Sequence, residues 1–161
     1  MTAAFATADL SDEYGDEVRA LLPGFVDYGG RRRFCGPVAT LKVHEDNSLV
    51  REALAQRGEG RVLVVDGGGS MRCALLGDNL ARLGSDNGWA GVVISGCIRD
   101  SAAIAGIDLG VKALGTHPAR SHKRGEGQRD IPVSFAGVTI APGMHLYADE
   151  DGMLISERRL L

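Results

Sequence analysis

An arginine and an aspartate stand side by side just after an apolar segment. The stretch GWAGVVISGCIRD, residues 88–100, runs from a buried strand predicted in GVVIS into Arg99 and Asp100. Open α/β sheets bind their ligands at the carboxyl ends of parallel strands. An arginine binds a carboxylate through two parallel hydrogen bonds, and a neighbouring aspartate suits a hard cation such as Mg²⁺. Such a pair would bind a small oxo-acid and stabilise the enolate formed when a C–C bond next to its carbonyl breaks.

The same two residues allow structural interpretations. Asp100 is a suitable cap for a short helix over SAAIAG, residues 101–106, and Arg99 and Asp100 can form an ion pair. The spacing alone leaves capping, ion pairing and ligand binding open.

A second candidate lies where a loop enters a predicted helix. Gly77, Asp78, Asn79 and Leu80 open the helical segment DNLARLGSDNG, and the N–H groups of a first helical turn can hold an anion. Ordinary capping by Asp78 or Asn79 is the alternative, and spacing alone favours it.

Other motifs argue against several classes of enzyme. The loop VLVVDGGGS, residues 62–70, lacks the spacing of a dinucleotide fingerprint, so Gly67–Gly69 are expected to provide a tight turn or a close approach. No G-x-S-x-G element indicates a serine hydrolase. The four histidines show no metal-binding spacing, and the three cysteines are expected to be reduced, mostly buried thiols.

These candidates need a sheet to position them. The elements predicted before the second half are a helix over residues 11–22 ended by Pro23-Gly24, a strand over 37–43, a helix over 48–56 capped by Asn47 or Ser48, a strand over 61–66, the helix at 78–88 and the strand at 91–95. The last strands and the helix between them predict a parallel βαβ unit. Beyond Gly115 short strands predict a more antiparallel half, and residues 119–130 an exposed loop. The fold class is α/β.

The length and composition of the chain indicate how many domains it forms and which kinds of partner it can bind. With 161 residues, 44% of them hydrophobic and 24% charged, we expect one domain over residues 1–161, without a membrane span. The start of the chain lacks the pattern of a secretory signal, so a cytoplasmic location is expected. A net charge of -3 disfavours direct binding of nucleic acid.

Several longer segments carry a resemblance to a known family. EDNSLVREAL, GRVLVVDGGGSMRCALLGDNLA, NGWAGVVISGCIRD, IDLGVKALGTHP and LYADEDGMLIS together resemble the family of the regulator of ribonuclease activity A, which includes class II 4-hydroxy-4-methyl-2-oxoglutarate aldolases that also decarboxylate oxaloacetate. The resemblance implies a swivelling β/β/α fold and a homotrimer with sites between subunits. It also implies that Gly77, Asp78, Asn79 and Leu80 bind substrate.

In the same way, the resemblance implies that Arg99 binds substrate and that Asp100 binds a divalent metal, Mg²⁺ or Mn²⁺. Ala103 departs from the aldolase pattern R-D-x-x-E/D, which has an acid at that position. The sequence therefore predicts a metal-dependent C–C lyase on small 2-oxo dicarboxylates, with decarboxylation favoured over aldol cleavage. The alternative is a non-catalytic inhibitor that contacts ribonuclease E or an associated helicase, with His122, Lys123, Arg124 and Arg129 as the contact surface.

Overall fold

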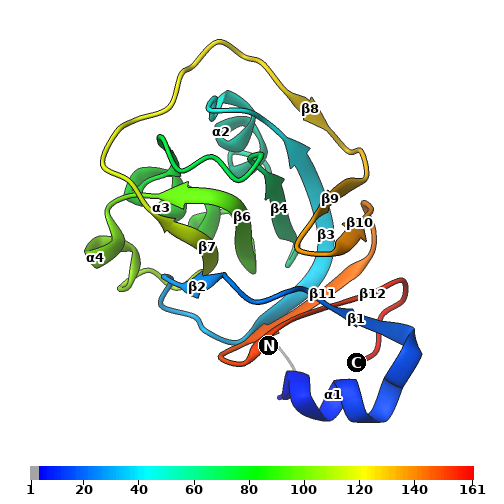
Figure 1. Ribbon diagram of the computed structural model, residues 1–161. Helices are drawn as coiled ribbons and strands as arrows, with labels where there is room; N and C mark the ends of the chain where they lie inside the picture. Colours follow the sequence, from blue (N-terminus) through cyan, green and yellow to red (C-terminus); the bar gives the residue numbers. More distant parts are fainter. Residues whose placement is uncertain (1–3) are drawn as a thin grey trace.

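The structure is a computed structural model that describes residues 4–161 (Figure 1). Its strands are β1 (Val18–Ala20), β2 (Val26–Asp27), β3 (Phe34–Lys42), β4 (Val62–Asp66), β5 (Ala74–Leu76), β6 (Gly91–Ile98), β7 (Gly110–Thr116), β8 (Gln128–Arg129), β9 (Val133–Phe135), β10 (Val138–Ile140), β11 (His145–Asp149) and β12 (Gly152–Ser156). Its helices are α1 (Thr7–Tyr14), the 3-10 turn η1 (Gly15–Glu17), α2 (Ser48–Leu54), α3 (Asp78–Asp86) and α4 (Ser101–Ile104).

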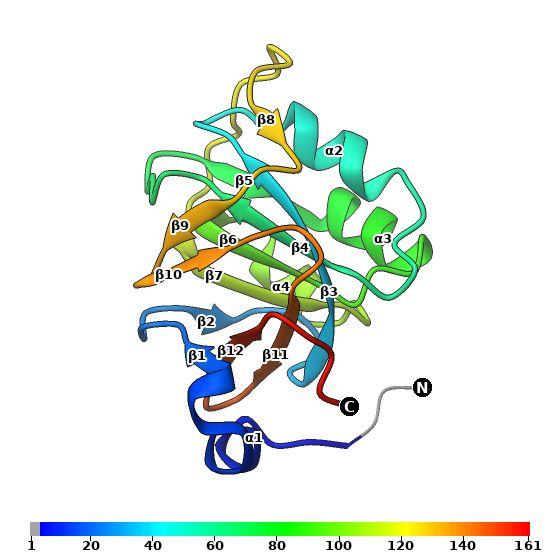
Figure 2. The ribbon, with the colours of Figure 1, turned by 90° about the vertical axis from the view of Figure 1, so that its right-hand side faces the viewer.

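One sheet connects most of these strands. Its order is β1-β12-β11-β3-β4-β6-β7-β2, with β5 beside β6 and β8 beside β3, while β9 and β10 form a separate hairpin. Strands β3, β4, β6 and β7 are parallel to one another, and α2 and α3 cover one of their faces (Figure 2). The predicted parallel βαβ unit, built from β4, α3 and β6, is confirmed.

The central strands are buried on both faces, which is why their sequences are apolar without alternation. Val65 and Ile94 pack on the side of the helices. Val64 and Val93 face the opposite way and pack under the hairpin and β11. On β4 and β6 this second face becomes polar where the strands end, while Thr40 of β3 and Lys112 of β7 are buried polar residues in register with Val64 and Val93.

The second half of the chain is more antiparallel, as its short segments predicted. Strand β11 pairs antiparallel with both β12 and β3, and β9 pairs with β10. The fold is therefore mixed α/β, with a parallel centre flanked by antiparallel strands. The carboxyl ends of β4 and β6 open on the side that the long segment 117–127 crosses (Figure 1).

The prediction of one helix over residues 11–22 is wrong beyond Tyr14. Gly15 adopts a positive φ of 49°, which ends α1, and β1 follows after a single 3-10 turn. Val18 then pairs with Ser156 at the edge of the sheet. Pairing with β12 overrides the helical pattern, because the apolar residues at 18 and 21 are buried against the sheet instead.

Two smaller predictions are confirmed. The glycine loop turns tightly after β4, with φ of 67° at Gly68 and 70° at Gly69, a region that glycine enters without steric cost. Cys35, Cys73 and Cys97 are free thiols, of which the last two are buried. Over the described part of the chain, the longest helices fall short of the length and apolar character that crossing a membrane requires.

Candidate active site

Strand β6 delivers Arg99 and Asp100 to the carboxyl end of the sheet. The N–H of Arg99 donates to the carbonyl of Leu76 at 2.9 Å, which fixes the end of the strand beside β5. Asp100 then adopts a left-handed conformation, with φ 57° and ψ 39°, and the chain turns into α4. Aspartate tolerates this region better than most residues, and the turn directs the Asp100 carboxylate away from the helix that follows it.

The carboxylate of Asp100 binds the beginning of a different helix. Its Oδ2 accepts a hydrogen bond from the N–H of Asp78 at 3.1 Å, across the gap between β6 and α3. A Cβ atom at position 77 would lie only 2.8 Å from this oxygen, so Gly77 leaves the room that the carboxylate occupies. The sequence separates these residues by about twenty positions, and the sheet brings them into contact.

Both capping alternatives for this region are therefore wrong. Within residues 4–161, no side chain at the N-cap of α3 or α4 forms a capping hydrogen bond, because the N-cap of α3 is Gly77 and Asp100 turns away from α4. Asp78 is occupied elsewhere, in an ion pair with Arg82 at 2.8 Å. The hydrogen bond from Arg82 is the main cause that holds the pKa of Asp78 below its usual range, so this carboxyl is ionised at neutral pH.

The ion-pair alternative for Arg99 is also wrong. In the described chain, Arg99 forms no salt bridge, and its Nη1 donates to the carbonyl of Pro118 at 3.3 Å. A guanidinium carries five N–H donors in a planar fork, so most of its donors stay available to an anion.

A small hollow surrounds this pair, which we call the Arg99–Asp100 pocket. Its volume is about 110 Å³. All of the predicted site residues line it, and the full set is Asn47, Arg51, Ala74, Gly77, Asp78, Asn79, Leu80, Arg99, Asp100, Arg120, Ser121 and Lys123. The structure thus brings together the two candidates that the sequence places separately.

Three basic residues of this pocket were missed as site residues by the sequence analysis. Arg51 comes from α2, while Arg120 and Lys123 come from the segment that crosses the end of the sheet. A backbone bridge between Ala74 and Arg120 holds that segment beside β5. A contact of this kind between distant segments leaves no local signal. With Arg99, the pocket has four cationic side chains against two carboxylates, which favours an anionic ligand.

Asp46 fastens the same segment to the rest of the molecule. Its side chain is 1% exposed, and its Oδ2 accepts the N–H groups of Arg124 at 2.8 Å and Glu126 at 3.3 Å. Its Oδ1 accepts the N–H of Ser48 at 2.9 Å, so the predicted side-chain cap of α2 by Asn47 or Ser48 is replaced by Asp46. Burial alone would raise the pKa of Asp46, but these hydrogen bonds outweigh it and hold the pKa below its usual range.

The oxygen ligands that the pocket offers to a metal suit a cation that keeps much of its water. Mg²⁺ commonly takes one or two protein carboxylates together with several waters, and the exposed Asp100 offers one. No group of three or more histidine, cysteine or carboxylate side chains placed to hold a metal occurs in residues 4–161.

Comparison with known proteins identifies the family. The model of the RraA-like family, described as Aldolase/RraA, matches residues 7–155. A protein of Alkalilimnicola ehrlichii that bears the name "putative 4-hydroxy-4-methyl-2-oxoglutarate aldolase" is 64% identical over 155 residues, which cover 96% of each chain. The chain therefore belongs to the RraA-like family, as the sequence resemblance indicated.

Two solved structures share the fold closely. A structure named S-adenosylmethionine:2-dimethylmenaquinone methyltransferase from Geobacillus kaustophilus has a TM-score of 0.95 and 51% identity, with 97% of each chain covered. The RNA-processing inhibitor RraA from Thermus thermophilis also has a TM-score of 0.95, with 47% identity over 99% of this chain and 96% of its own. The names of these relatives therefore span three different activities on one fold.

Proposed function

We propose that this protein is a divalent-metal-dependent C–C lyase that acts on small 2-oxo dicarboxylates. The observation that carries the proposal is the Arg99–Asp100 pocket. In it, the Arg99 guanidinium, which has N–H donors available, and the Asp100 carboxylate, which accepts the N–H of Asp78, line one hollow. Cationic side chains outnumber carboxylates in the lining of this hollow. The relatives named as aldolases support the same class of reaction.

Different residues of the pocket are proposed to bind different groups of the substrate. Arg99 donates to the 2-oxo group and to the adjacent carboxylate, and it stabilises the negative charge that develops on the oxygen as the enolate forms. The first-turn N–H groups of Asn79 and Leu80 point out of the helix N-terminus and favour the same anion. Arg120 and Lys123 lie on the other wall and suit the second carboxylate of the substrate.

Asp100 is the residue that would hold Mg²⁺ or Mn²⁺, with waters completing the shell. The ion, when bound, supplies Lewis acidity at the 2-oxo oxygen. Asp78 stays ionised beside it through its pairing with Arg82, so it is placed to orient a bound water rather than to store a proton.

Decarboxylation of oxaloacetate is the reaction that these residues support first. It requires chelation and enolate stabilisation, whereas aldol cleavage also requires a base that takes the proton of the 4-hydroxyl group. Ala103 occupies the position of the acid in the aldolase pattern, and it lies exposed on α4. This residue therefore supplies no base.

A coupled assay for pyruvate tests the proposal. Purified protein with Mg²⁺ should decarboxylate oxaloacetate faster than Mg²⁺ alone, and EDTA should remove the difference. Heat-denatured protein at the same concentration serves as the control for catalysis by free metal and by exposed side chains. A rate equal to that of Mg²⁺ alone would exclude the lyase.

We also infer that the chain acts as one domain in a cytoplasmic homotrimer. Strands β1 and β2 are the two edge strands of the sheet, and the side chains of Leu22, which follows β1, and Val26, which is in β2, are 61% and 47% exposed. Closed symmetric association is a common way to cover such edges and apolar side chains. Light scattering at micromolar concentration should give the mass of three chains, and the mass of one chain would contradict the inference.

A second candidate function is inhibition of ribonuclease E through protein contact. The 47% identity to the RNA-processing inhibitor from Thermus thermophilis favours it. Of the predicted contact residues, Arg129 is paired with Glu52 at 3.0 Å and Lys123 lines the Arg99–Asp100 pocket. His122 and Arg124 are therefore the residues that can serve contact alone. Slower cleavage of RNA by ribonuclease E of the same organism in the presence of this protein would support the regulator, and an unchanged rate would exclude it.

A further inference from the structure

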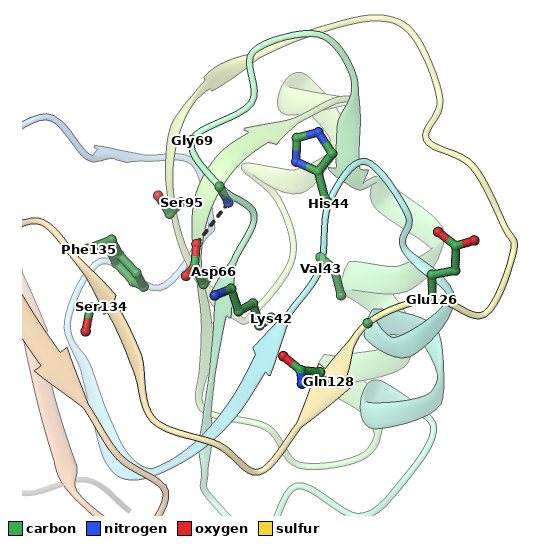
Figure 3. Close-up of a pocket in the computed structure, with 12 residues that line it drawn as sticks. Lys42, Val43, His44, Asp66, Gly69, Ser95, Glu126, Gln128, Ser134 and Phe135 are labelled. Carbon is green, nitrogen blue, oxygen red and sulfur yellow. Dashed lines mark hydrogen bonds between the residues drawn. The ribbon is translucent and has the colours of Figure 1, made fainter.

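A second and larger cavity lies at the carboxyl ends of the same strands, on the face away from α2 and α3. Its volume is about 730 Å³. Lys42 of β3, Asp66 of β4 and Ser95 of β6 line it, and they are direct neighbours in the register of the parallel sheet. Figure 3 shows the side chain of Lys42 reaching toward Asp66, whose carboxylate is directed to the glycine loop, and we call this hollow the Lys42–Asp66 cavity.

The strand periodicity explains why these polar residues share a face. Asp66 follows Val64 by two positions on β4, and Ser95 follows Val93 by two positions on β6, so each continues a face that is apolar further down. The hairpin of β9 and β10 covers that face, and Phe135 gives the cavity an apolar wall (Figure 3). The change from valine to aspartate and serine therefore occurs where the cover opens.

The polar groups of the cavity are not matched to one another. Asp66 is 8% exposed and Ser95 is 6% exposed. The N–H of Gly68 donates to Asp66 Oδ1 at 2.9 Å. In the described part of the chain, Asp66 Oδ2 and Ser95 Oγ have no hydrogen-bond partner, and Lys42 and Asp66 form no ion pair.

Another buried aspartate, Asp149, has hydrogen-bond partners on both of its carboxylate oxygens. Asp149 is 4% exposed, and its carboxylate accepts the N–H and the hydroxyl of Thr7 at 2.7 Å each and the N–H of Asp151 at 3.0 Å. Folding thus satisfies Asp149 completely, while Asp66 retains an oxygen for a partner from solution. Asp66 Oδ2 is not one of the buried side-chain atoms that lack a partner in residues 4–161, so it remains accessible to a solute that enters the cavity.

We propose that the Lys42–Asp66 cavity binds a small zwitterion of the α-amino acid class. The ammonium group donates to Asp66 Oδ2 and Ser95 Oγ, and the carboxylate accepts from Lys42 Nζ. The side chain of the ligand lies toward Phe135. One acid and one base on the floor match one positive and one negative group on a ligand, whereas a simple anion would meet the charge of Asp66.

This site is separate from the proposed lyase site. Among the described residues, the two hollows share no lining side chain, although Lys123 and Glu126 of one continuous segment line one hollow each. Binding at the Lys42–Asp66 cavity is therefore independent of whether the Arg99–Asp100 pocket cleaves C–C bonds.

Titration calorimetry of the purified protein with each standard amino acid tests the proposal without any activity assay. At least one amino acid should bind, and its methyl ester and its N-acetyl derivative should bind at least about tenfold more weakly, because each lacks one charged group. Absence of binding by all of the standard amino acids would overturn the proposal.

Matched variants locate the binding. Lys42→Met removes an exposed ammonium and Asp66→Asn keeps the size of the side chain, so both should weaken binding by about tenfold or more while melting like the wild type. Lys123→Met makes the same change in the Arg99–Asp100 pocket and should leave the affinity unchanged. The reverse pattern, with loss only in Lys123→Met, would place the amino acid in the other pocket and overturn the proposal.

Discussion

Two aspartates at the same end of the sheet show opposite uses of a carboxylate. Asp46 is buried, and its two oxygens accept three backbone N–H groups that join α2 to the segment 122–126. Asp100 is exposed, and one backbone N–H, that of Asp78, donates to its Oδ2. The Asp46 carboxylate uses its hydrogen bonds to hold the fold together. The Asp100 carboxylate is held in place by a single contact and remains open to a ligand, so function is expected to depend on Asp100 and stability on Asp46.

The largest effect on activity should come from Asp100→Asn. The amide keeps the size of the side chain but removes the negative charge that the proposed Mg²⁺ requires, so metal-dependent decarboxylation should fall by about 100-fold or more. The midpoint of thermal unfolding should stay within a few degrees of the wild type, because the side chain is exposed. The pyruvate-coupled rate and a melting curve check both parts, and an active Asp100→Asn variant would move the site elsewhere.

Arg99→Ala should lower the rate by about 100-fold, with a higher KM as well as a lower kcat. The guanidinium is proposed to contact both the ground state and the developing enolate, so binding and the chemical step both suffer. Its contact with the carbonyl of Pro118 is on the surface and contributes little to stability. Arg82→Ala, which removes only the partner of Asp78, provides a comparison and should have a smaller effect than Arg99→Ala.

Asp46→Asn should affect stability more than activity, the reverse of Asp100→Asn. Its free energy of unfolding should fall by about 2 kcal/mol. An amide cannot accept all three N–H donors, so the segment that carries Arg120 and Lys123 loses its anchor. Urea unfolding should show the loss, and the KM for oxaloacetate should rise more than kcat falls. A variant as stable as the wild type would show that Asp46 does not fasten this segment.

The same variant should change the response to acid. The folded pKa of Asp46 lies below its unfolded value, so its contribution to stability is present above about pH 4 and is lost as the pH falls through the folded pKa. The wild type should therefore lose more stability between about pH 5 and pH 3 than Asp46→Asn does. Urea unfolding across this range checks the sign.

The smallest effects separate the two candidate functions. Lys123→Glu reverses a charge in the Arg99–Asp100 pocket and should raise the KM for oxaloacetate several-fold. Arg124→Glu lies next to it in the chain but outside the pocket lining, so lyase activity should persist while any inhibition of ribonuclease E is lost. Equal effects of both variants on KM would show that the whole loop acts as one charged surface.

Much of the centre of the fold was predictable, because a buried parallel strand needs an unbroken apolar run, as in RVLVVD at residues 61–66. The position of Arg99 and Asp100 after such a strand predicts a candidate site, because open α/β sheets bind ligands at the carboxyl ends of their parallel strands. The end of the first helix at Tyr14 was not predictable, since pairing of Val18 with Ser156 decides it. The presence of Arg51 and Arg120 in the lining of the pocket was not predictable, because it depends on contacts between distant segments.

Binding of Mn²⁺ tests the central contrast most directly. Electron paramagnetic resonance measures free Mn²⁺, and its signal should decrease when wild-type protein or Asp46→Asn is added together with pyruvate. Asp100→Asn should leave the signal unchanged at the same concentrations. Mn²⁺ binding by Asp100→Asn as tight as that of the wild type would contradict the assignment of the metal to Asp100.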